Sequence, residues 1–231
     1  MPRKTQAVVF DLDDTLYPFD QFRRSGFGAV AAYLDHTRGI DSRAAYRQLS
    51  RASRGPGRGR ELQLLLEAMD LPRTLLPELV DLVRHHIPSL KLPPASLRVL
   101  NALRQDWKLG ILTNGSQSTQ ARKVAGLGVA PLVDAVVYAV QHGSGMGKPE
   151  PAPFLAIADR LRVAPSRVVF VGDDETADIR GAAGVGMRTV RVTKWRAAPR
   201  GTTADALVAS IAELPKILPG IFRKAPVRHA A

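Results

Sequence analysis

Short runs of apolar, mostly β-branched residues recur along the chain, and each run ends in small or polar residues. Runs of this kind are typical of parallel strands that are buried on both faces of a sheet. Segments with the 3.6-residue period of amphipathic helices separate the later runs, which is the alternation of a parallel α/β sheet. We expect strands at residues 7–10, 109–112, 135–139, 168–171 and 189–192, and helices at residues 95–103, 117–125, 153–161 and 176–183.

The interval from residue 17 to residue 91 breaks this alternation. It contains no convincing strand, and its apolar residues follow a helical period in segments that glycines and a proline interrupt. Pro88, Pro93 and Pro94 stiffen the connection back to the sheet. The pattern therefore predicts an all-helical insertion after the first strand, with helices at residues 22–34, 42–49, 61–69 and 75–86.

The composition is that of a globular protein, and the sequence contains no cysteine. The chain has 231 residues, 45% of them hydrophobic, which suffices for one large core or for a core with a small second domain. Because there is no cysteine, disulfides, a thiolate zinc site and a cysteine nucleophile are excluded, and a metal must bind to oxygen or imidazole ligands. No apolar run approaches the ~20 residues that span a bilayer, and the first residues do not have the apolar region of a signal peptide. We therefore expect a cytoplasmic protein with no membrane partner.

The chain is strongly basic, with 33 lysines and arginines, 21 aspartates and glutamates, and a formal net charge of +12. A positive field raises the local concentration of anions, so an anionic substrate or partner is expected. The excess is spread along the chain, and few aromatic residues lie near the arginines, so we do not expect nucleic acid to be the partner. In the helical insertion, Arg23, Arg24 and the arginine-glycine stretch 53–60 can form a solvated face or a site for an anionic group, and the sequence leaves both open.

Polar residues that could do chemistry follow four of the predicted strands. In open parallel sheets, ligands bind beyond the carboxyl ends of the strands, so these residues are expected to meet at one edge of the sheet. They are residues 11–15 after the first strand, 113–116 after the second, 148–149 after the third, and 172–175 with Asp178 after the fourth.

The acidic residues among them suggest a metal site. Asp11 and Asp13 are two residues apart, which aims both side chains to one side of an extended chain. Close carboxylates repel one another unless a cation binds them, and hard oxygen ligands suit Mg²⁺, to which Asp173 could add a further carboxylate. Residues 173–175 could equally cap the amino terminus of a helix, and the sequence alone does not decide between the two interpretations.

Three other ligand-binding motifs are excluded by the residues at their key positions. A calcium-binding EF-hand loop in the first cluster would need glycine and glutamate where Leu16 and Phe22 stand. A phosphate-binding P-loop ending at Lys148 would need glycine where His142 stands. A dinucleotide-binding fingerprint at Gly172 is excluded because the acidic residues that follow would repel a pyrophosphate.

Taken together, the four clusters resemble the motifs of the haloacid dehalogenase-like hydrolase superfamily. The first motif is matched by residues 10–16 (Phe-Asp-Leu-Asp-Asp-Thr-Leu), the second by 112–115 (Leu-Thr-Asn-Gly), the third by 147–151 (Gly-Lys-Pro-Glu-Pro) and the fourth by 171–178. The motifs stand in the family's order, and the resemblance covers the chain from residue 7 to about residue 192.

This resemblance implies a Rossmann-like, doubly wound α/β core. The helical insertion is similar to the family's subclass I cap, which closes over the active site. The domains expected are a core of residues 1–16 and 92–215, a helical cap of residues 17–91, and a flexible tail of residues 216–231, which the resemblance does not cover.

The same resemblance assigns roles to residues of this chain. Asp11 is implied to be the nucleophile, which forms an aspartyl-phosphate, and Asp13 the general acid and base. Mg²⁺ is implied to bind Asp11, the backbone carbonyl of Asp13, and Asp173. A carboxylate that attacks a phosphate dianion faces like-charge repulsion, which the dication and the Lys148 ammonium would reduce. The supporting residues are Thr113, Asn114 and Gly115, which bind phosphate oxygens, Asp178, which orients Lys148 or a metal-bound water, and Asp174, which is close to the metal site or solvated.

Within this superfamily the residues favour phosphate chemistry. Its dehalogenases lack the second aspartate of the first motif because a halide leaves without a proton, whereas an alkoxide needs one, so Asp13 indicates a phosphatase. A phosphomutase would use the same residues while excluding water, and a nucleic-acid-binding domain without turnover is the alternative from another class. We predict a Mg²⁺-dependent phosphatase, monomeric or homodimeric, that hydrolyses a small phosphorylated metabolite such as a nucleotide or sugar phosphate.

Overall fold

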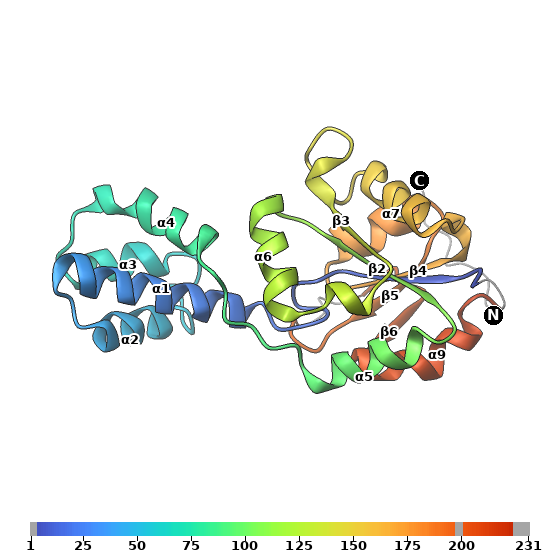
Figure 1. Cartoon of the computed structure of the whole chain (residues 1–231), viewed down its shortest axis with the longest axis horizontal. Helices are drawn as coiled ribbons and strands as arrows, with labels where there is room; N and C mark the ends of the chain where they lie inside the picture. The colour runs from blue at the N-terminus through green and yellow to red at the C-terminus, as the bar shows by residue number, and fades with distance from the viewer. Residues whose placement is uncertain (1–3, 197–200, 224–231) are drawn as a thin grey trace. The chain divides into compact units, whose positions relative to one another are not determined.

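The computed structural model describes residues 4–196 and 201–223, which form two compact units (Figure 1). The first unit holds the start of the chain up to Pro18 together with the chain from Lys91 onward, and the second unit is Phe19–Leu90. We call them the sheet unit and the helical unit. The sequence places the helical insertion at residues 17–91.

The sheet unit is built on parallel strands. Among the described residues these are β1 (Ala7–Phe10), β2 (Lys108–Thr113), β3 (Ala135–Tyr138), β4 (Val168–Gly172), β5 (Arg188–Val192) and β6 (Ala206–Val208). Their order is β3-β2-β1-β4-β5-β6, and every neighbouring pair is parallel (Figure 1). The chain moves outward from β1 in one direction and then returns to β4 and moves outward in the other, which is the doubly wound arrangement. The predicted fold class is confirmed.

The edge strand β6 is absent from the predicted set. It has three residues and lies beside β5, with Leu207 54% exposed. A short strand that is half exposed carries no run of buried apolar residues, and such a run is the signal that identifies the other strands.

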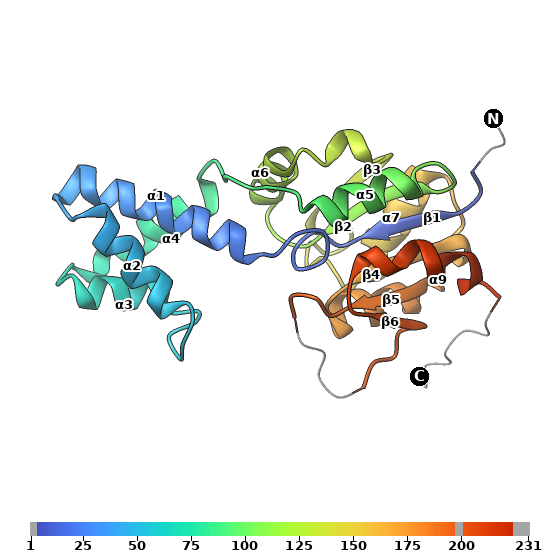
Figure 2. The same ribbon diagram turned by 90° about the horizontal axis from the view of Figure 1, so that it is seen from below.

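Helices cover both faces of the sheet. On one face α7 (Pro151–Leu161) packs against β2 and β3, and on the other α5 (Pro94–Leu103) lies against α9 (Leu214–Ile221), as Figure 2 shows. Gly110 lets α7 approach β2, because a Cβ there would lie 3.1 Å from the side chains of Ile157 and Leu161. The other helices of this unit are α6 (Gln117–Leu127) and α8 (Gly181–Gly184), with short turns at η2 (Ala130–Leu132), η3 (Ala139–Gln141), η4 (Pro165–Arg167) and η6 (Ile211–Glu213).

After β4 the chain forms a π-helical turn, η5 (Glu175–Arg180), where the sequence predicts an α-helix at residues 176–183. The backbone amides of Asp178 and Ile179 both donate to the carbonyl of Asp174, so the turn takes up one residue more than an α-helical turn. The α-helical continuation is limited to α8.

The predicted flexible tail is wrong for its first residues, which belong to α9. Leu214, Leu218 and Ile221 are buried, at a helical spacing that the intervening prolines and glycine obscure in the sequence. Pro215 lies in the first turn of α9, where a backbone donor is not needed. The predicted tail at residues 224–231 lies outside the described residues.

The helical unit has an apolar core of its own. It consists of α1 (Asp20–Arg38), α2 (Ser42–Ala52), α3 (Glu61–Ala68) and α4 (Leu76–His85), with a 3₁₀ turn, η1 (Arg73–Leu75), before α4. Gly39 ends α1 in the left-handed conformation, with φ of +66°, and the Asp41 side chain caps α2 by accepting hydrogen bonds from two amides of its first turn. The core side chains include Phe27, Val30, Leu34, Ala45, Leu49, Leu65, Leu66, Leu75 and Leu79.

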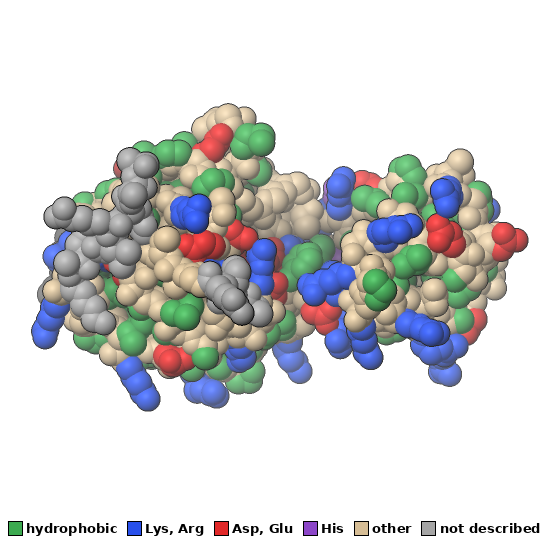
Figure 3. Space-filling model, turned by 180° about the vertical axis from the view of Figure 1, so that it is seen from behind, with side chains coloured by type: hydrophobic (Ala, Val, Ile, Leu, Met, Phe, Trp, Pro, Cys, Tyr) green, Lys and Arg blue, Asp and Glu red, His purple; other side chains and the backbone are tan. Residues whose placement is uncertain are grey.

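No helix in the described part of the chain combines the length and the apolar character that a membrane span requires. On the face drawn in Figure 3, lysine and arginine side chains are spread over both units, with acidic side chains among them. The surface therefore carries the basic excess of the sequence over a wide area.

Candidate active site

Asp11 and Asp173 lie close together because their strands are neighbours. β1 and β4 pair with Phe10 opposite Val171, and the amide of Asp11 donates to the carbonyl of Val171 over 2.9 Å. Asp178, on η5, joins them: one carboxylate oxygen from each of the three aspartates lies within 4.8 Å of the others. All three residues are buried. The structure therefore brings these three predicted residues into one acidic cluster at the carboxyl edge of the sheet.

Lys148 places its ammonium in this acidic cluster. Its Nζ lies 2.6 Å from Asp11 Oδ1 and 2.7 Å from Asp178 Oδ1, and it also donates to the carbonyl of Leu112 over 3.1 Å. Burial alone would lower the pKa of Lys148, but the carboxylates of Asp11 and Asp178 raise it above its ordinary value. The lysine therefore stays charged and offsets part of the negative charge of the cluster.

The side chain of Asn114 fixes the backbone at Lys148. Asn114 Oδ1 accepts from the Lys148 amide over 2.8 Å, and Asn114 Nδ2 donates to the Lys148 carbonyl over 2.9 Å. Gly147 precedes the lysine with φ of +78°, and a Cβ there would lie 2.7 Å from Asn114 Oδ1, so this position requires glycine. The Asn114 side chain is thus engaged with the backbone of Lys148. Its predicted contact with phosphate would therefore be made by the Asn114 backbone amide.

Lys148 does not offset all of the negative charge in the cluster. Burial raises the pKa of Asp11 well above its ordinary value; Lys148 opposes this shift, and Asp178 and Asp13 add to it. Burial also raises the pKa of Asp173 to about 6, with Asp178 adding to the shift and Arg196 opposing it. Such shifts mean that burial and the neighbouring carboxylates disfavour the ionised forms, an effect that a bound cation would reverse. A buried set of oxygen donors with this excess fits a hard divalent cation such as Mg²⁺.

Asp178 also shapes the loop that follows β4. Its Oδ2 accepts from the amides of Asp173 and Asp174, each over 3.1 Å, while its Oδ1 accepts from Lys148. A Cβ at Gly172 would lie 2.3 Å from Asp178 Oδ2, so glycine allows this close approach. Asp178 thus joins Lys148 to the backbone that presents Asp173.

The helix-capping interpretation applies to Asp174 and not to Asp173. Asp174 Oδ1 accepts from the amides of Thr176 and Ala177 over 2.9 and 2.8 Å, and its Oδ2 pairs with Arg196 over 2.9 Å. Burial alone would raise the pKa of Asp174, but these bonds lower it below its ordinary value. Arg196 also lies 3.2 Å from Asp173 Oδ2, a contact for which the sequence gives no signal.

The carboxylate of Asp13 belongs to a second polar group, separate from the acidic cluster. The Tyr17 hydroxyl donates to Asp13 Oδ1 over 2.6 Å, and Lys123 Nζ lies 3.0 Å from Oδ1 and 2.8 Å from Oδ2. Gln120 Nε2 donates to Oδ2 over 3.1 Å. Burial and Asp13 raise the pKa of Tyr17 above its ordinary value, so its hydroxyl remains a donor. The predicted metal contact of Asp13 concerns its backbone carbonyl and stays a prediction.

Tyr17, Gln120 and Lys123 are site residues that the sequence analysis does not identify. Gln120 and Lys123 lie on α6, and they are 1% and 3% exposed. A glutamine and a lysine on the inward face of a helix are a usable signal, because buried polar side chains need partners. The signal appears only when the inward face of the helix is known.

Thr113 and Gly115 lie at the turn between β2 and α6. Thr113 ends β2, and its buried hydroxyl accepts a hydrogen bond from Gln120 Nε2. Gly115 adopts φ of +116°, and the Ser116 side chain caps α6. A helix amino terminus beside a hydroxyl offers hydrogen-bond donors to an anion. The predicted phosphate-binding residues are therefore adjacent in the structure.

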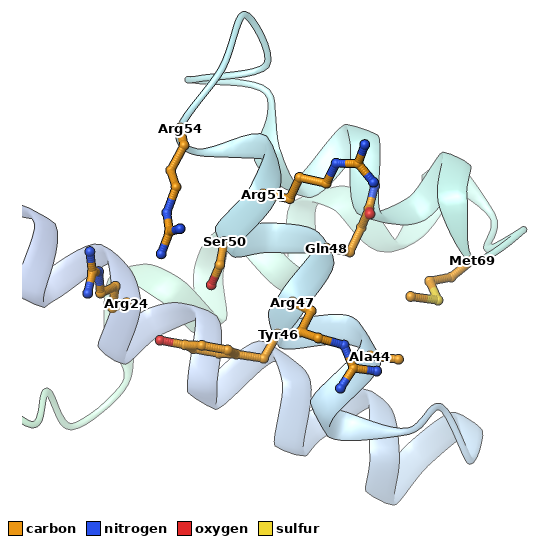
Figure 4. Close-up of a pocket in the computed structure, with 9 residues that line it drawn as sticks. All are labelled: Arg24, Ala44, Tyr46, Arg47, Gln48, Ser50, Arg51, Arg54 and Met69. Atoms are coloured by element: carbon orange, nitrogen blue, oxygen red, sulfur yellow. The ribbon is translucent and has the colours of Figure 1, made fainter.

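The helical unit carries a groove of about 800 Å³ that arginines line (Figure 4). Arg24 and Arg54 point toward the same hollow as the hydroxyls of Tyr46 and Ser50. The Ser50 hydroxyl is buried and has no hydrogen-bond partner among the described residues. Arg23 forms ion pairs with acidic residues of α1 and α3 and does not line this groove. Arg24 lines the groove with its side chain exposed, and its Nε pairs with Asp20 Oδ2 over 2.5 Å.

The chain is similar to known proteins in sequence and in structure. A family model for haloacid dehalogenase-like hydrolases matches residues 5–186. The glyceraldehyde 3-phosphate phosphatase of Methanopyrus kandleri is 33% identical over 83% of this chain and 85% of its own length. The ribulose-1,5-bisphosphate 5-phosphatase of Halopiger xanaduensis is 31% identical over 80% of this chain and 83% of its own length. The crystal structure of a HAD phosphatase from Thermococcus onnurineus has a TM-score of 0.61 and 29% identity, covering 93% of this chain and 98% of that one.

Proposed function

The chain belongs to the haloacid dehalogenase-like hydrolase family and is a phosphatase, as its motifs predict, and we propose that it depends on Mg²⁺ and forms an aspartyl-phosphate on Asp11. The observation that carries the proposal is the position of the Asp11 carboxylate, which lies against the Lys148 ammonium in the cluster with Asp173 and Asp178. A carboxylate nucleophile must approach a phosphate dianion, and positive charge beside it reduces the repulsion between them.

In the first half of the proposed reaction, a carboxylate oxygen of Asp11 forms a bond to phosphorus while the bond from phosphorus to the leaving oxygen breaks. Asp13 donates a proton to that oxygen, because an alkoxide is a poor leaving group. The Thr113 hydroxyl and the amides at the start of α6 hold the other phosphate oxygens. Asp11, Asp173 and the backbone carbonyl of Asp13 would hold Mg²⁺, which would supply further positive charge beside the phosphate.

In the second half, water attacks phosphorus and the bond to Asp11 breaks. The Asp13 carboxylate takes a proton from this water, so inorganic phosphate is released and both aspartates return to their starting forms. Lys148 keeps Asp11 oriented, and Asp178 keeps Lys148 and the loop after β4 in place. Asp174 supports the site as the cap of η5.

The substrate class with most support is a small phosphorylated sugar. Two relatives carry the names of phosphatases for glyceraldehyde 3-phosphate and for ribulose 1,5-bisphosphate. The net charge of +12 favours the approach of such anions. Nucleotides are the alternative substrates, and a panel that contains both classes separates them.

The experiment that tests the proposal measures phosphate release from this panel with Mg²⁺ and with EDTA, for the wild type and for Asp11→Asn. We expect release that depends on Mg²⁺ and that falls by at least about 10³-fold in the variant, because the nucleophile is removed. Circular dichroism and thermal unfolding serve as the control for folding. Full activity of a folded Asp11→Asn variant would overturn the assignment of the nucleophile.

The same panel separates hydrolysis from phosphoryl transfer within the substrate. A phosphomutase would release phosphate slowly and return an isomerised sugar phosphate, which chromatography of the products detects. We expect stoichiometric phosphate and dephosphorylated sugar.

A further inference from the structure

The proposed reaction uses Asp13 but gives no task to the three side chains that hold its carboxylate. Lys123 contacts both oxygens, Gln120 donates to Oδ2, and Tyr17 donates to Oδ1, each within 3.1 Å. Two elements supply these donors: the turn after β1 supplies Tyr17, and α6 supplies the other two. A carboxylate with donors on both oxygens is held in one orientation.

The Lys123 side chain is buried, whereas the side chain of Asp13 is partly exposed. The Lys123 side chain is 4% exposed, whereas the Asp13 side chain is 26% exposed. A buried ammonium is unfavourable unless a charged partner compensates for the lost hydration, and Asp13 is that partner here. The arrangement leaves Asp13 accessible to a substrate and keeps Lys123 covered.

Asp11 and Asp13 of the first motif pair with two different buried lysines. Asp11 pairs with Lys148, which also contacts the acidic cluster through Asp178. Asp13 pairs with Lys123, which lies on α6, over 2.8 Å. Asp11 and Asp13 thus each lie within ion-pair distance of a different ammonium.

Gln120 ties Asp13 to the phosphate-binding turn. Its Nε2 donates both to Asp13 Oδ2 and to the Thr113 hydroxyl. A Cβ at Gly115 would lie 3.3 Å from the Gln120 side chain, so the turn approaches this glutamine closely. One side chain thus sets the distance between the residue that would transfer the proton and the turn that would hold the phosphate.

We propose that Lys123, with Gln120 and Tyr17, is a positioning residue that holds the Asp13 carboxyl group in place for its proton transfers. The proposal rests on the proposed function, in which Asp13 is the general acid and base. When phosphorus bonds to Asp11, the proton of Asp13 moves to the leaving oxygen; when water attacks, its proton moves to the Asp13 carboxylate. Both transfers require the same carboxyl group at a fixed distance from the phosphate, which is what the three donors provide.

The inference is tested with two probes of similar size whose leaving groups differ. Phenyl phosphate needs a proton on its leaving oxygen, whereas 2,4-dinitrophenyl phosphate leaves readily without one. In both cases kcat/KM reports the steps up to formation of the aspartyl-phosphate, so water attack does not obscure the comparison. The variants are Lys123→Met, which removes the charge at nearly constant length, and Lys123→Arg, which keeps the charge.

We expect Lys123→Met to lower kcat/KM for phenyl phosphate by about 10–100-fold, and for 2,4-dinitrophenyl phosphate by less than about 3-fold. Lys123→Arg should recover part of the lost activity. Asp13→Asn should show the same selectivity with a larger loss, and the double variant should lose no more than Asp13→Asn alone, because both changes act on one group. Lys216→Met, on the exposed face of α9, is the matched control and should change neither probe.

An equal loss on both probes in Lys123→Met would overturn the inference, because it would assign Lys123 to phosphate binding or to folding. No loss on either probe would overturn it as well. If Asp13→Asn lowers kcat/KM equally for both probes, the proposed role of Asp13 as general acid fails. If Asp13→Asn is selective for phenyl phosphate and Lys123→Met is not, only the inference about Lys123 fails. Should Lys123→Met not fold, Tyr17→Phe removes one donor to Asp13 while keeping the ring, and the same selectivity is then required of it.

Discussion

The sheet unit buries its functional charges in pairs, whereas the arginines that line the groove of the helical unit are exposed. In the sheet unit, the side chains of Lys148 and Lys123 are 2% and 4% exposed, and each lies against an aspartate. In the helical unit, residues 42–60 hold six arginines and no acidic residue. The side chains of Arg24 and Arg47 are 56% and 70% exposed, and they form surface ion pairs with Asp20 and Asp41.

This contrast separates two uses of charge. A buried ion pair is held in one geometry because a misplaced partner leaves an uncompensated charge, and a reacting group needs such a fixed geometry. Exposed guanidinium groups gain little from a surface ion pair, so they can exchange that partner for an anionic ligand at small cost. The sheet unit is thus suited to chemistry, and the groove of the helical unit is suited to recognition of an anion.

The largest effect on stability and activity is expected for Lys148→Met, which removes a buried charge from the sheet unit. Removal of the ammonium leaves Asp11 and Asp178 without their shared partner, so we expect a loss of about 3–5 kcal/mol in the free energy of unfolding. Phosphate release should fall by at least about 10³-fold. Urea denaturation and the phosphatase assay measure the two effects, with Lys216→Met as the exposed control. A loss below about 1 kcal/mol would mean that Lys148 is not needed to compensate the buried carboxylates.

The second prediction concerns Asp173 in metal-free protein. Its pKa is about 6 in the folded chain against an ordinary value of 3.8, so the folded state binds this proton more tightly than the unfolded state. The stabilising contribution is fully present below pH 3.8 and is lost as the pH rises through about 6. Relative to Asp173→Asn, the wild type should therefore lose about 2 kcal/mol of unfolding free energy between pH 4 and pH 7.

Urea denaturation in EDTA at several pH values measures this difference. Added Mg²⁺ should stabilise the ionised form and reduce the loss. A difference between the two proteins that does not change with pH would contradict the assigned environment of Asp173.

The third prediction compares a glycine in each unit. Gly110→Ala places a Cβ 3.1 Å from Ile157 and Leu161 in the packed sheet unit, and we expect a loss of about 1–3 kcal/mol. Gly28 lies on the exposed side of α1, where a Cβ meets nothing within 4 Å, so Gly28→Ala should gain about 0.5–1 kcal/mol. Thermal unfolding measures both, and changes of the same sign would contradict the packing described for one of the two units.

The smallest effect is expected at the arginine groove. Arg24→Gln and Arg54→Gln should each change the unfolding free energy by less than about 0.5 kcal/mol, because both side chains are exposed. Thermal unfolding of the two variants checks this. A loss above about 1 kcal/mol in either variant would show that the arginines hold the helical unit together and would remove the distinction between the two units.

The sequence predicts the parallel sheet and the cluster at its edge because both depend on local patterns. The buried strands are apolar runs, and Asp11 and Asp173 directly follow two of them, so their meeting is a consequence of parallel pairing. Lys148 comes from the segment after β3, where the Asn114 side chain binds its backbone. The edge strand β6 and the helix α9 have no such pattern: one is too short, and prolines interrupt the other.

The rest of the site depends on contacts that a pattern does not contain. At residues 173–175, the Asp178 carboxylate accepts from the amides of Asp173 and Asp174, a contact that the sequence pattern does not show. The partners of Asp13 become visible only when α6 turns Gln120 and Lys123 toward β1. The spacing of motifs in the sequence therefore predicts the residues that follow the strands. The side chains that contact those residues are identified only from the packed structure.

The reciprocal bonds between the Asn114 side chain and the backbone of Lys148 imitate the exchange of two bonds between paired strands. These two bonds fix the backbone at Lys148 as pairing would fix a strand, although Lys148 lies outside the strands of the sheet. Insertions or substitutions in the exposed loop before Gly147 can therefore accumulate during evolution while the amine stays registered against the end of β2.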